Sequence, residues 1–204
     1  MNSTPQPAIG VTILGAGASV RMGRPKLLMP WRETTVIGQI IFTWRELRAA
    51  QIVVVMRPDD AMLSAELDRL GFPEGNRILN PRPDQGMFSS VLCAANWPGW
   101  QKEIAAWAIV LGDQPHLNQQ GLQKLVAFEA QHLDKISQPA VGGRIGHPVI
   151  LSQMAFDELK RTKAATLKEF LKLRTASCVQ FEMADPGVLL DMDTPEDYIR
   201  LAAS

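Results

Sequence analysis

The chain has 204 residues, 46% of them hydrophobic and 21% charged, a composition typical of a globular domain with a substantial core. Its 21 lysine and arginine residues balance its 21 acidic residues, so overall charge favours neither nucleic acid nor an anionic membrane, and we expect neither as a partner. Only Cys93 and Cys178 could pair, and no apolar segment approaches the roughly 20 residues that span a bilayer. We therefore predict one domain over residues 1–204, with a flexible amino terminus at 1–7, in the cytoplasm.

The first predicted strand, Ala8 to Leu14, leads into a loop rich in glycine and cations that ends at Lys26. Small residues leave backbone N–H groups accessible, and the charges of Arg21 and Lys26 lie beside them, a combination that binds phosphates. The loop fits neither the dinucleotide fingerprint nor the Walker A pattern. A simple turn would explain the glycines but does not require the cations, so we predict a nucleotide site here.

Strand-like and helix-like segments alternate along the rest of the chain. Further strands are predicted at 52–56, 77–80, 104–111, 149–151 and 177–181. Helices are predicted at 35–47, after the capping residue Asn118, over 156–173 with an interruption near 162–165, and from Thr194 onward. This alternation predicts an α/β layered fold with a mainly parallel sheet, whose ligands bind at the carboxyl ends of the strands.

Two acidic segments are candidates for a metal site. Asp113 directly follows the strongest predicted strand, and Asp191 and Asp193 precede the last helix. Carboxylates from different loops commonly hold Mg²⁺ against phosphates, and we prefer Asp113 with Asp193, leaving Asp191 as the alternative ligand or as a support behind them. Each segment also has a purely structural explanation, as a turn that closes a strand or as the start of a helix.

Three further segments carry candidate site residues. Asn80 ends a predicted strand, and Gly86 to Ser90 enter the next helix, where Gly86 allows close backbone approach. Ser90 could contact a nucleotide, whereas Ser89 could equally be a helix cap. His147 lies in a loop before a strand and could contact an acceptor phosphate; the three histidines do not form a metal-ligand set.

Taken in order, these segments resemble the molybdenum cofactor cytidylyltransferases, within the nucleotidyltransferases that include molybdopterin-guanine dinucleotide synthase. The matching stretches span nearly the whole chain: Leu14 to Trp31, Asn80-Pro81, Gly86-Met87 with Ser90, Gly112 to Pro115, Gly146 to Pro148, and Asp191 to Asp197. The resemblance implies a Rossmann-like three-layer nucleotidyltransferase fold. It also implies an enzyme in which an acceptor phosphate attacks the α-phosphorus of a nucleoside triphosphate and pyrophosphate leaves.

The resemblance also implies roles for individual residues. Arg21 and Lys26 would neutralise the triphosphate, and Asp113 with Asp193 would hold Mg²⁺. The nucleotide would be lined by Leu14, Gly15, Ala16, Gly17, Asn80, Gly86 and Ser90. Guanylyl members of the group typically carry glycine where this chain has Ala16, and cytidylyl members carry alanine, so CTP is the expected nucleotide.

The predicted function is therefore Mg²⁺-dependent transfer of CMP from CTP to the terminal phosphate of a molybdopterin-type cofactor, with a molybdoenzyme or its chaperone as a further partner. Two alternatives of the same class are a sugar or polyol phosphate as acceptor, and GTP as donor. Residues 161–165 lack the glycines that family members often carry there, which bears on the acceptor side. A third alternative is a non-catalytic nucleotide- or cofactor-binding partner of a molybdoenzyme, which the presence of Arg21, Lys26 and Asp113 disfavours.

Overall fold

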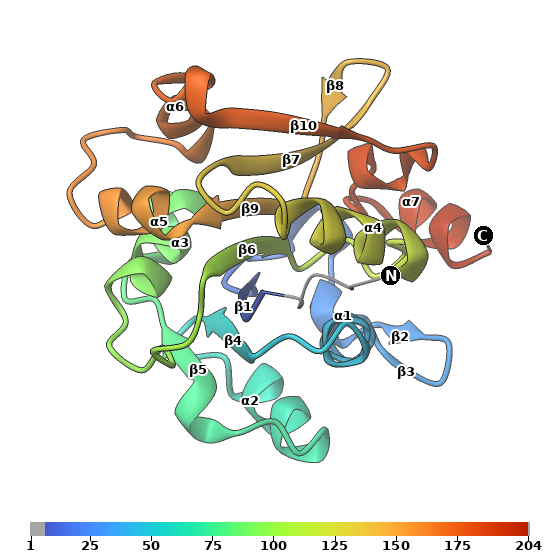
Figure 1. Cartoon of the computed structure of the whole chain (residues 1–204). Helices are drawn as coiled ribbons and strands as arrows, with labels where there is room; N and C mark the ends of the chain where they lie inside the picture. Colours follow the sequence, from blue (N-terminus) through green and yellow to red (C-terminus); the bar gives the residue numbers. More distant parts are fainter. Residues whose placement is uncertain (1–6, 204) are drawn as a thin grey trace.

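The computed structural model describes residues 7–203, apart from the side chain of Val20, and is built around an eight-stranded sheet (Figure 1). The strand order is β10 (Cys178–Glu182), β7 (Ile136–Val141), β9 (Val149–Ser152), β6 (Ala106–Leu111), β1 (Ile9–Leu14), β4 (Gln51–Met56) and β5 (Arg77–Leu79), with β8 (Arg144–Ile145) paired to β7. Strand β9 runs antiparallel to both of its neighbours, and β8 is antiparallel to β7; the other pairs are parallel. The predicted mainly parallel sheet is confirmed. The expectation for residues 1–7 lies outside the described residues, except for Pro7.

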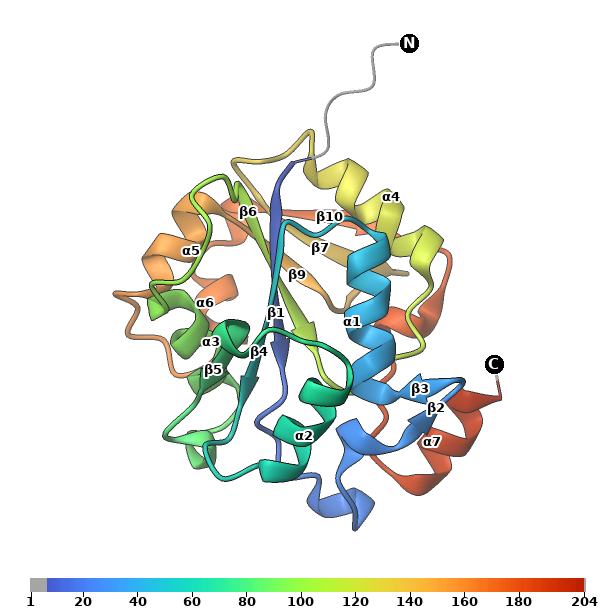
Figure 2. The same cartoon turned by 90° about the horizontal axis from the view of Figure 1, so that it is seen from below.

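Helices cover both faces of the sheet, which gives the predicted three layers (Figure 2). One face is covered by α1 (Val36–Glu46), α2 (Ala61–Arg69) and α4 (Gln119–Glu129). The other is covered by α3 (Met87–Asn96), α5 (Gln153–Leu159) and α6 (Leu167–Lys172). The last helix, α7 (Pro195–Ala202), lies beside a small hairpin of β2 (Pro30–Trp31) and β3 (Thr34–Thr35). Short 3₁₀ turns occur at Val20–Met22, Lys26–Leu28, Glu74–Asn76, Pro83–Gln85, Thr175–Ser177 and Pro186–Leu189.

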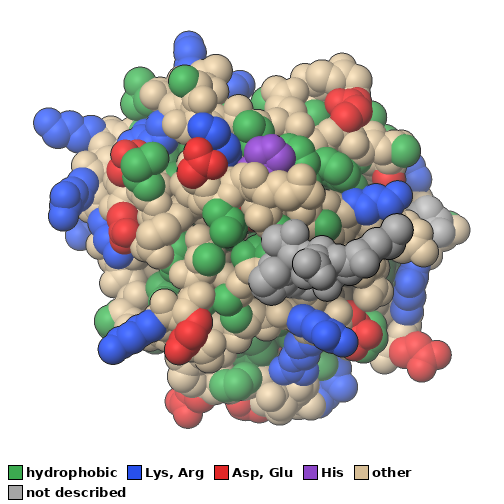
Figure 3. Space-filling view, in the orientation of Figure 1, with side chains coloured by type: hydrophobic (Ala, Val, Ile, Leu, Met, Phe, Trp, Pro, Cys, Tyr) green, Lys and Arg blue, Asp and Glu red, His purple; other side chains and the backbone are tan. Residues whose placement is uncertain are grey.

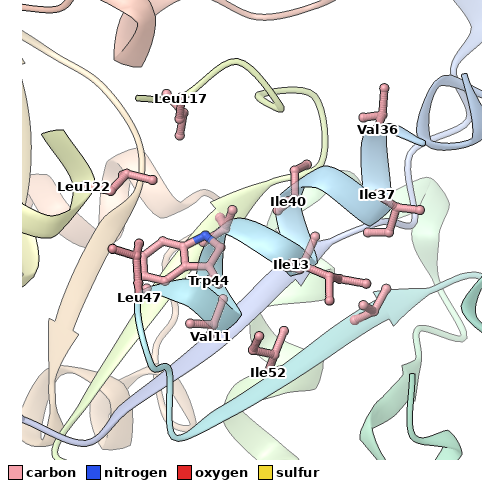
Figure 4. Close-up of a cluster of buried hydrophobic side chains, with 14 of the residues drawn as sticks. Val11, Ile13, Val36, Ile37, Ile40, Trp44, Leu47, Ile52, Leu117 and Leu122 are labelled. Atoms are coloured by element: carbon pink, nitrogen blue, oxygen red, sulfur yellow. The ribbon is translucent and has the colours of Figure 1, made fainter. Parts of the chain in front are cut away.

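The packing of α1 on the sheet fixes the strand that precedes the glycine loop. Ile37, Ile40 and Trp44 recur at helical spacing along α1 and lie over Val11 and Ile13 of β1 (Figure 4). Trp44 is only 2% exposed, so this face of the helix is removed from water. Because β1 is held between α1 on one side and α3 on the other, the position of the loop after Leu14 is set by the core.

Most predicted elements appear close to where the sequence places them. Asn118 caps α4, its side-chain oxygen accepting from the Gly121 N–H at 3.0 Å, and Thr194 caps α7 in a reciprocal capping box with Asp197. The helix predicted from Phe156 begins earlier, at Gln153, because Ser152 caps it. The predicted interruption separates α5 from α6.

Strand β7 was not predicted, because its sequence, Ile136 to Val141, contains serine, glutamine and proline where a buried strand usually carries branched apolar residues. Pro139 is tolerated because β7 pairs with β9 only at Ile136 and Ser137, so its missing N–H is not needed on that side. Helix α2 also lies outside the predicted elements.

Charged side chains are spread over the face at which β1 begins, with hydrophobic atoms between them in small groups (Figure 3). On the part of the chain from residue 7 to residue 203, no helix is long and apolar enough to cross a membrane.

One ionisable side chain, Glu129, is buried between α4 and β7. Glu129, at the end of α4, is completely buried, and neither carboxyl oxygen has a hydrogen-bond partner among the described residues. Burial raises the pKa of Glu129 to about 8; the nearby Ser137 hydroxyl works against this increase, and the charge of Asp134 adds to it. Glu129 is therefore protonated in the folded protein at neutral pH.

Replacing Glu129 should change how stability depends on pH. A carboxyl whose pKa is higher in the folded than in the unfolded protein stabilises the fold at low pH and ceases to do so as pH rises through the folded pKa. We expect Glu129→Gln to gain stability relative to the unmodified chain as pH rises from 5.5 to 8.5, so that the difference between their free energies of unfolding increases over this range by on the order of a few kcal/mol. Urea unfolding at both pH values measures this, with Glu103→Gln, an exposed site, as control. A difference between the two chains that stays constant across this range would contradict the assignment.

Candidate active site

The glycine loop begins where the ends of β1, β4 and β6 come very close together. The Gly15 N–H donates to the Val55 carbonyl oxygen at 2.8 Å, which ties the start of the loop to β4. A Cβ atom on Gly112, just after β6, would lie 2.6 Å from the Leu14 carbonyl oxygen, which is impossible without a backbone shift. Gly112 is therefore required by the close approach of the strands, whereas a Cβ on Gly17 would meet nothing within 4 Å.

The far end of the loop turns back toward the sheet. Ser19 has a positive φ of 50°, and its side-chain oxygen accepts a hydrogen bond from the Lys26 N–H at 3.1 Å. This bond closes the loop over seven residues and helps to hold the backbone of Lys26. As a result, the Lys26 side chain lies inside the site and is only 13% exposed.

Lys26 lies between two carboxylates that come from distant parts of the chain. Its Nζ atom is 3.1 Å from Asp113 Oδ2 and 3.0 Å from Asp193 Oδ1. Arg21 Nη1 lies 2.9 Å from the other oxygen of Asp193. The predicted residues Arg21, Lys26, Asp113 and Asp193 thus form one cluster, the Lys26–carboxylate cluster.

Asp191 is close to this cluster and forms a hydrogen bond with Gln114. Gln114 Nε2 donates to Asp191 Oδ1 and to the Leu190 carbonyl oxygen, each at 3.1 Å. Desolvation raises the pKa of the Asp191 carboxyl, and the charges of Asp113 and Asp193 raise it further. The backbone is also tied here, because the Met192 N–H donates to the Asp113 carbonyl oxygen at 3.1 Å.

The donor set of the cluster fits a divalent cation with oxygen ligands. Asp113 Oδ1 is buried and has no hydrogen-bond partner among residues 7–203, so it has a free lone pair for a ligand. The position between Asp113 and Asp193 also attracts positive charge, because Lys26 Nζ lies there. The described residues contain no group of three or more His, Cys, Asp or Glu side chains that could hold a metal. Mg²⁺ commonly takes one or two protein carboxylates and completes its shell with phosphate and water oxygens. Asp113 and Asp193 match that pattern.

A cavity of about 560 Å³ opens beside the glycine loop, at the carboxyl ends of β1, β4 and β6. It is called the glycine-loop cavity below, and its lining comprises residues 14–19, Lys26, Leu27, Arg57, Pro83, Asp84, Gly86, Met87, Ser90 and residues 111–113. Most of the predicted nucleotide-binding residues therefore line one space. Arg21 and Asp193 are not part of the lining. Asp193 forms ion pairs with Arg21 and with Lys26, and Lys26 lines the cavity.

Arg57 is a lining residue that the sequence analysis missed. It follows β4 directly and borders both this cavity and a hollow of about 590 Å³ on the α2 side of the loop. Its Nε atom donates to Asp59 at 3.2 Å. A cation placed directly after a buried parallel strand is the signal that could have identified it, because the ligand edge of the sheet lies there.

Asn80 has a different place from the one predicted. It is 1% exposed and does not line the cavity, because its own polar atoms are used within the protein. Its Nδ2 donates to the hydroxyls of Ser89 and Ser90, and its Oδ1 accepts from the Arg82 N–H. Asn80 thus positions Ser90, which does line the cavity. Gly86 has a φ of 84°, a conformation that favours glycine.

None of the three histidines forms a hydrogen bond or ion pair with the Lys26–carboxylate cluster within the described residues. His147 lines a second cavity, beside α6; its Nδ1 is buried without a partner among the described residues, and burial lowers its pKa. His116 Nε2 lies 3.0 Å from the Gly187 carbonyl oxygen, and burial lowers its pKa as well. His132 follows α4 and stacks on Phe128. At neutral pH the first two imidazoles are therefore neutral.

A glycine loop that carries cations, facing carboxylates across the ligand edge of an α/β sheet, is the arrangement that the resemblance implies. Residues 11–179 match the model of the MobA-like NTP transferase domain. The chain belongs to this family. A MobA-like NTP transferase is an enzyme of nucleotidyl transfer.

Relatives of this MobA-like NTP transferase carry different names. It is 27% identical to the molybdenum cofactor cytidylyltransferase of Escherichia coli K12, over 94% of each chain. It is 25% identical to the nicotine blue oxidoreductase of Paenarthrobacter nicotinovorans, over 98% of this chain and 100% of that one. Among solved structures, the manganese complex of a Mycobacterium tuberculosis H37Rv protein superposes with a TM-score of 0.69 at 22% identity, covering 98% of this chain and 100% of that one. That similarity shows a common fold.

The Lys26–carboxylate cluster should contribute to the free energy of unfolding of the protein. Removing Lys26 leaves two partly buried carboxylates close together with only Arg21 nearby, so we expect Lys26→Met to lower the free energy of unfolding by about 1–3 kcal/mol. Adding Asp113→Asn removes one of those charges and should recover part of the loss. Urea unfolding of the single and double variants tests this, with the exposed Lys124→Met as control. Additive effects of the two substitutions would mean that the contacts are not energetically coupled.

Proposed function

We propose that this MobA-like NTP transferase transfers CMP from CTP to the terminal phosphate of a molybdopterin-type cofactor. The observation that carries the proposal is the Lys26–carboxylate cluster at the edge of the glycine-loop cavity, where a half-buried lysine and two carboxylates converge. Phosphoryl-type transfer needs positioning and charge neutralisation more than it needs a nucleophilic side chain, and this site offers both. The E. coli relative, a molybdenum cofactor cytidylyltransferase, supports the choice of acceptor.

In the proposed reaction, an oxygen of the acceptor phosphate attacks the α-phosphorus of CTP. A new P–O bond forms there, the bond from the α-phosphorus to the bridging oxygen of the β-phosphate breaks, and pyrophosphate leaves with that electron pair. The small residues of the loop, such as Gly17, would let the phosphates approach its backbone closely. Lys26 lines the same cavity and Arg21 lies next to it in the cluster, so their charges would neutralise the triphosphate and the leaving pyrophosphate.

Asp113 and Asp193 are the residues that would hold Mg²⁺. When bound, the metal ion would supply positive charge to the phosphate oxygens during transfer. The unpartnered, buried Oδ1 of Asp113 supports this assignment, and the Mycobacterium tuberculosis protein of the same fold was solved with manganese. Asp191, which Gln114 holds by a hydrogen bond, would act behind the two ligands by keeping the loop before α7 in place.

Ala16 supports CTP as the nucleotide. It is 7% exposed and lines the glycine-loop cavity, so its methyl group narrows the space next to a bound base. A single methyl discriminates by about 1–3 kcal/mol, in favour of the smaller pyrimidine over guanine. Ala16→Gly is therefore expected to increase the use of GTP relative to CTP.

Alternative functions remain distinguishable by their chemistry. A sugar or polyol phosphate as acceptor would leave the nucleotide side unchanged. A molybdoenzyme or its chaperone would be the recipient of the product under our proposal, and a purely non-catalytic partner role would give nucleotide binding without turnover. The relative named nicotine blue oxidoreductase adds redox chemistry as a candidate, which would require a nicotinamide or similar donor and would release no pyrophosphate.

Pyrophosphate release is the measurement that decides among these functions. The purified chain is incubated with Mg²⁺ and each of CTP, GTP, ATP and UTP, with and without molybdenum-loaded molybdopterin. We expect release that depends on both CTP and the cofactor. Release with GTP instead would overturn the interpretation of Ala16, and binding without any release would favour a different acceptor, such as a sugar or polyol phosphate, or the non-catalytic or redox alternatives.

Asp113→Ala should separate catalysis from folding. We expect a loss of at least about 100-fold in metal-dependent turnover, because one of two metal carboxylates is removed from the place where charge develops. Circular dichroism should remain unchanged. Asp134→Ala, an exposed residue after α4, serves as the matched control and should retain full activity. Full turnover by the Asp113 variant would exclude a metal role for this residue.

A further inference from the structure

A second cavity of about 550 Å³ lies next to the glycine-loop cavity, between α6 and the face of the sheet formed by β7, β9 and β10. We call it the α6 cavity. Met87, the first residue of α3, lines both cavities. A molecule in the α6 cavity would therefore lie next to a nucleotide bound at the glycine loop.

The floor of the α6 cavity carries two side-chain amides placed side by side. Gln138 on β7 and Gln180 on β10 are direct register partners in a parallel strand pair. Ile136 and Cys178, two positions earlier on the same strands, both belong to the cluster packed under α5 and α6, so the two glutamines face the same side of the sheet.

Neither amide is satisfied by the protein. The side chains of Gln138 and Gln180 make no hydrogen bond to any residue in the described part of the chain; Gln180 is exposed to solvent, whereas Gln138 is only 6% exposed and lines the cavity. A buried primary amide without a partner is unfavourable unless something else supplies the hydrogen bonds. Hydrogen bonds to the Gln138 amide must therefore come from whatever fills the cavity.

The remaining walls restrict what that occupant can be. Leu167, Leu171 and Val149 provide an apolar surface suited to a flat ring. Lys168 and Lys172, four residues apart on α6, add two positive charges at the border, and no acidic side chain lines the cavity. The occupant is therefore expected to combine a planar apolar face, polar edge atoms and a negative charge.

We propose that Gln138 and Gln180 are the specificity-determining pair of the acceptor side, and that they bind a planar heterocycle through adjacent N–H and C=O groups on its edge. The paired amides offer a donor and an acceptor to such a lactam edge, while Lys168 and Lys172 attract anionic substituents. A sugar or polyol phosphate has no flat face and no lactam edge, so the pair selects against it. This inference rests on the proposed function for the identity of the reaction, but the binding that it predicts requires no turnover.

The proposal is tested by titrating the full chain with two ligands and measuring binding by fluorescence and by calorimetry. One is pterin-6-carboxylate, a planar lactam with one negative charge, and the other is phenyl phosphate, which is flat and anionic but lacks the lactam edge. We expect Gln138→Leu and Gln180→Leu each to weaken pterin-6-carboxylate binding by about tenfold, with phenyl phosphate binding changed less than about twofold. Lys168→Ala should weaken the binding of both probes.

Gln180 is exposed, so its variant is expected to fold even if the buried Gln138 variant does not, and Gln123→Leu on the exposed side of α4 is the matched control. Equal weakening of both probes, no effect on either, or no preference of the unmodified chain for the lactam would overturn the proposal. Glutamine-dependent probe binding without pyrophosphate release would refute the proposed function alone. Pyrophosphate release with probe binding that ignores the glutamines would refute this inference alone.

Discussion

The arrangement of the site depends on one lysine that neutralises two carboxylates. Asp113 follows β6 and Asp193 precedes α7, and each lies about 3 Å from Lys26 Nζ. Without an intervening cation, the two carboxylates would repel each other in a partly buried place. Lys26 is in turn held by the bond from its N–H to Ser19, so the glycine loop, the central strand and the end of the chain converge through a single ammonium group.

The part of the site near this cluster could be predicted from the sequence because it obeys local rules. Gly15 and Lys26 follow a strongly apolar strand, Asp113 follows another, and parallel strands end at the same edge of a sheet. The capping residue Thr194 likewise marked the last helix and, with it, the place of Asp193. Apolar periodicity and caps are encoded within a few neighbouring residues, which is why they can be read without a structure.

Other features could not be predicted, because they depend on contacts between segments far apart in the chain. Strand β7 contains Ser137, Gln138 and Pro139, which do not predict a strand. It forms one because it pairs along its length with β10, more than 35 residues later in the chain. Asn80 lies close to the ligand edge, yet its amide is fully used by Ser89, Ser90 and the Arg82 N–H. Whether a polar side chain meets a ligand or another residue is decided by the partners that tertiary structure places beside it, and the sequence does not list these partners.

The proposals divide the site into a part that would bind phosphates in general and a part that would select one acceptor. Under the proposed function, the glycine loop and the Lys26–carboxylate cluster recognise phosphates and charge, features that nucleoside triphosphates share. The paired amides on β7 and β10 differ from these groups, because each amide offers a hydrogen-bond donor next to an acceptor, and a phosphate dianion can use only the donor. Relatives of this chain bear names as different as a cytidylyltransferase and an oxidoreductase. Substrate identity in such a fold would be set where unsatisfied polar groups point into an apolar cavity, since a partner lacking the matching edge leaves them unpaired.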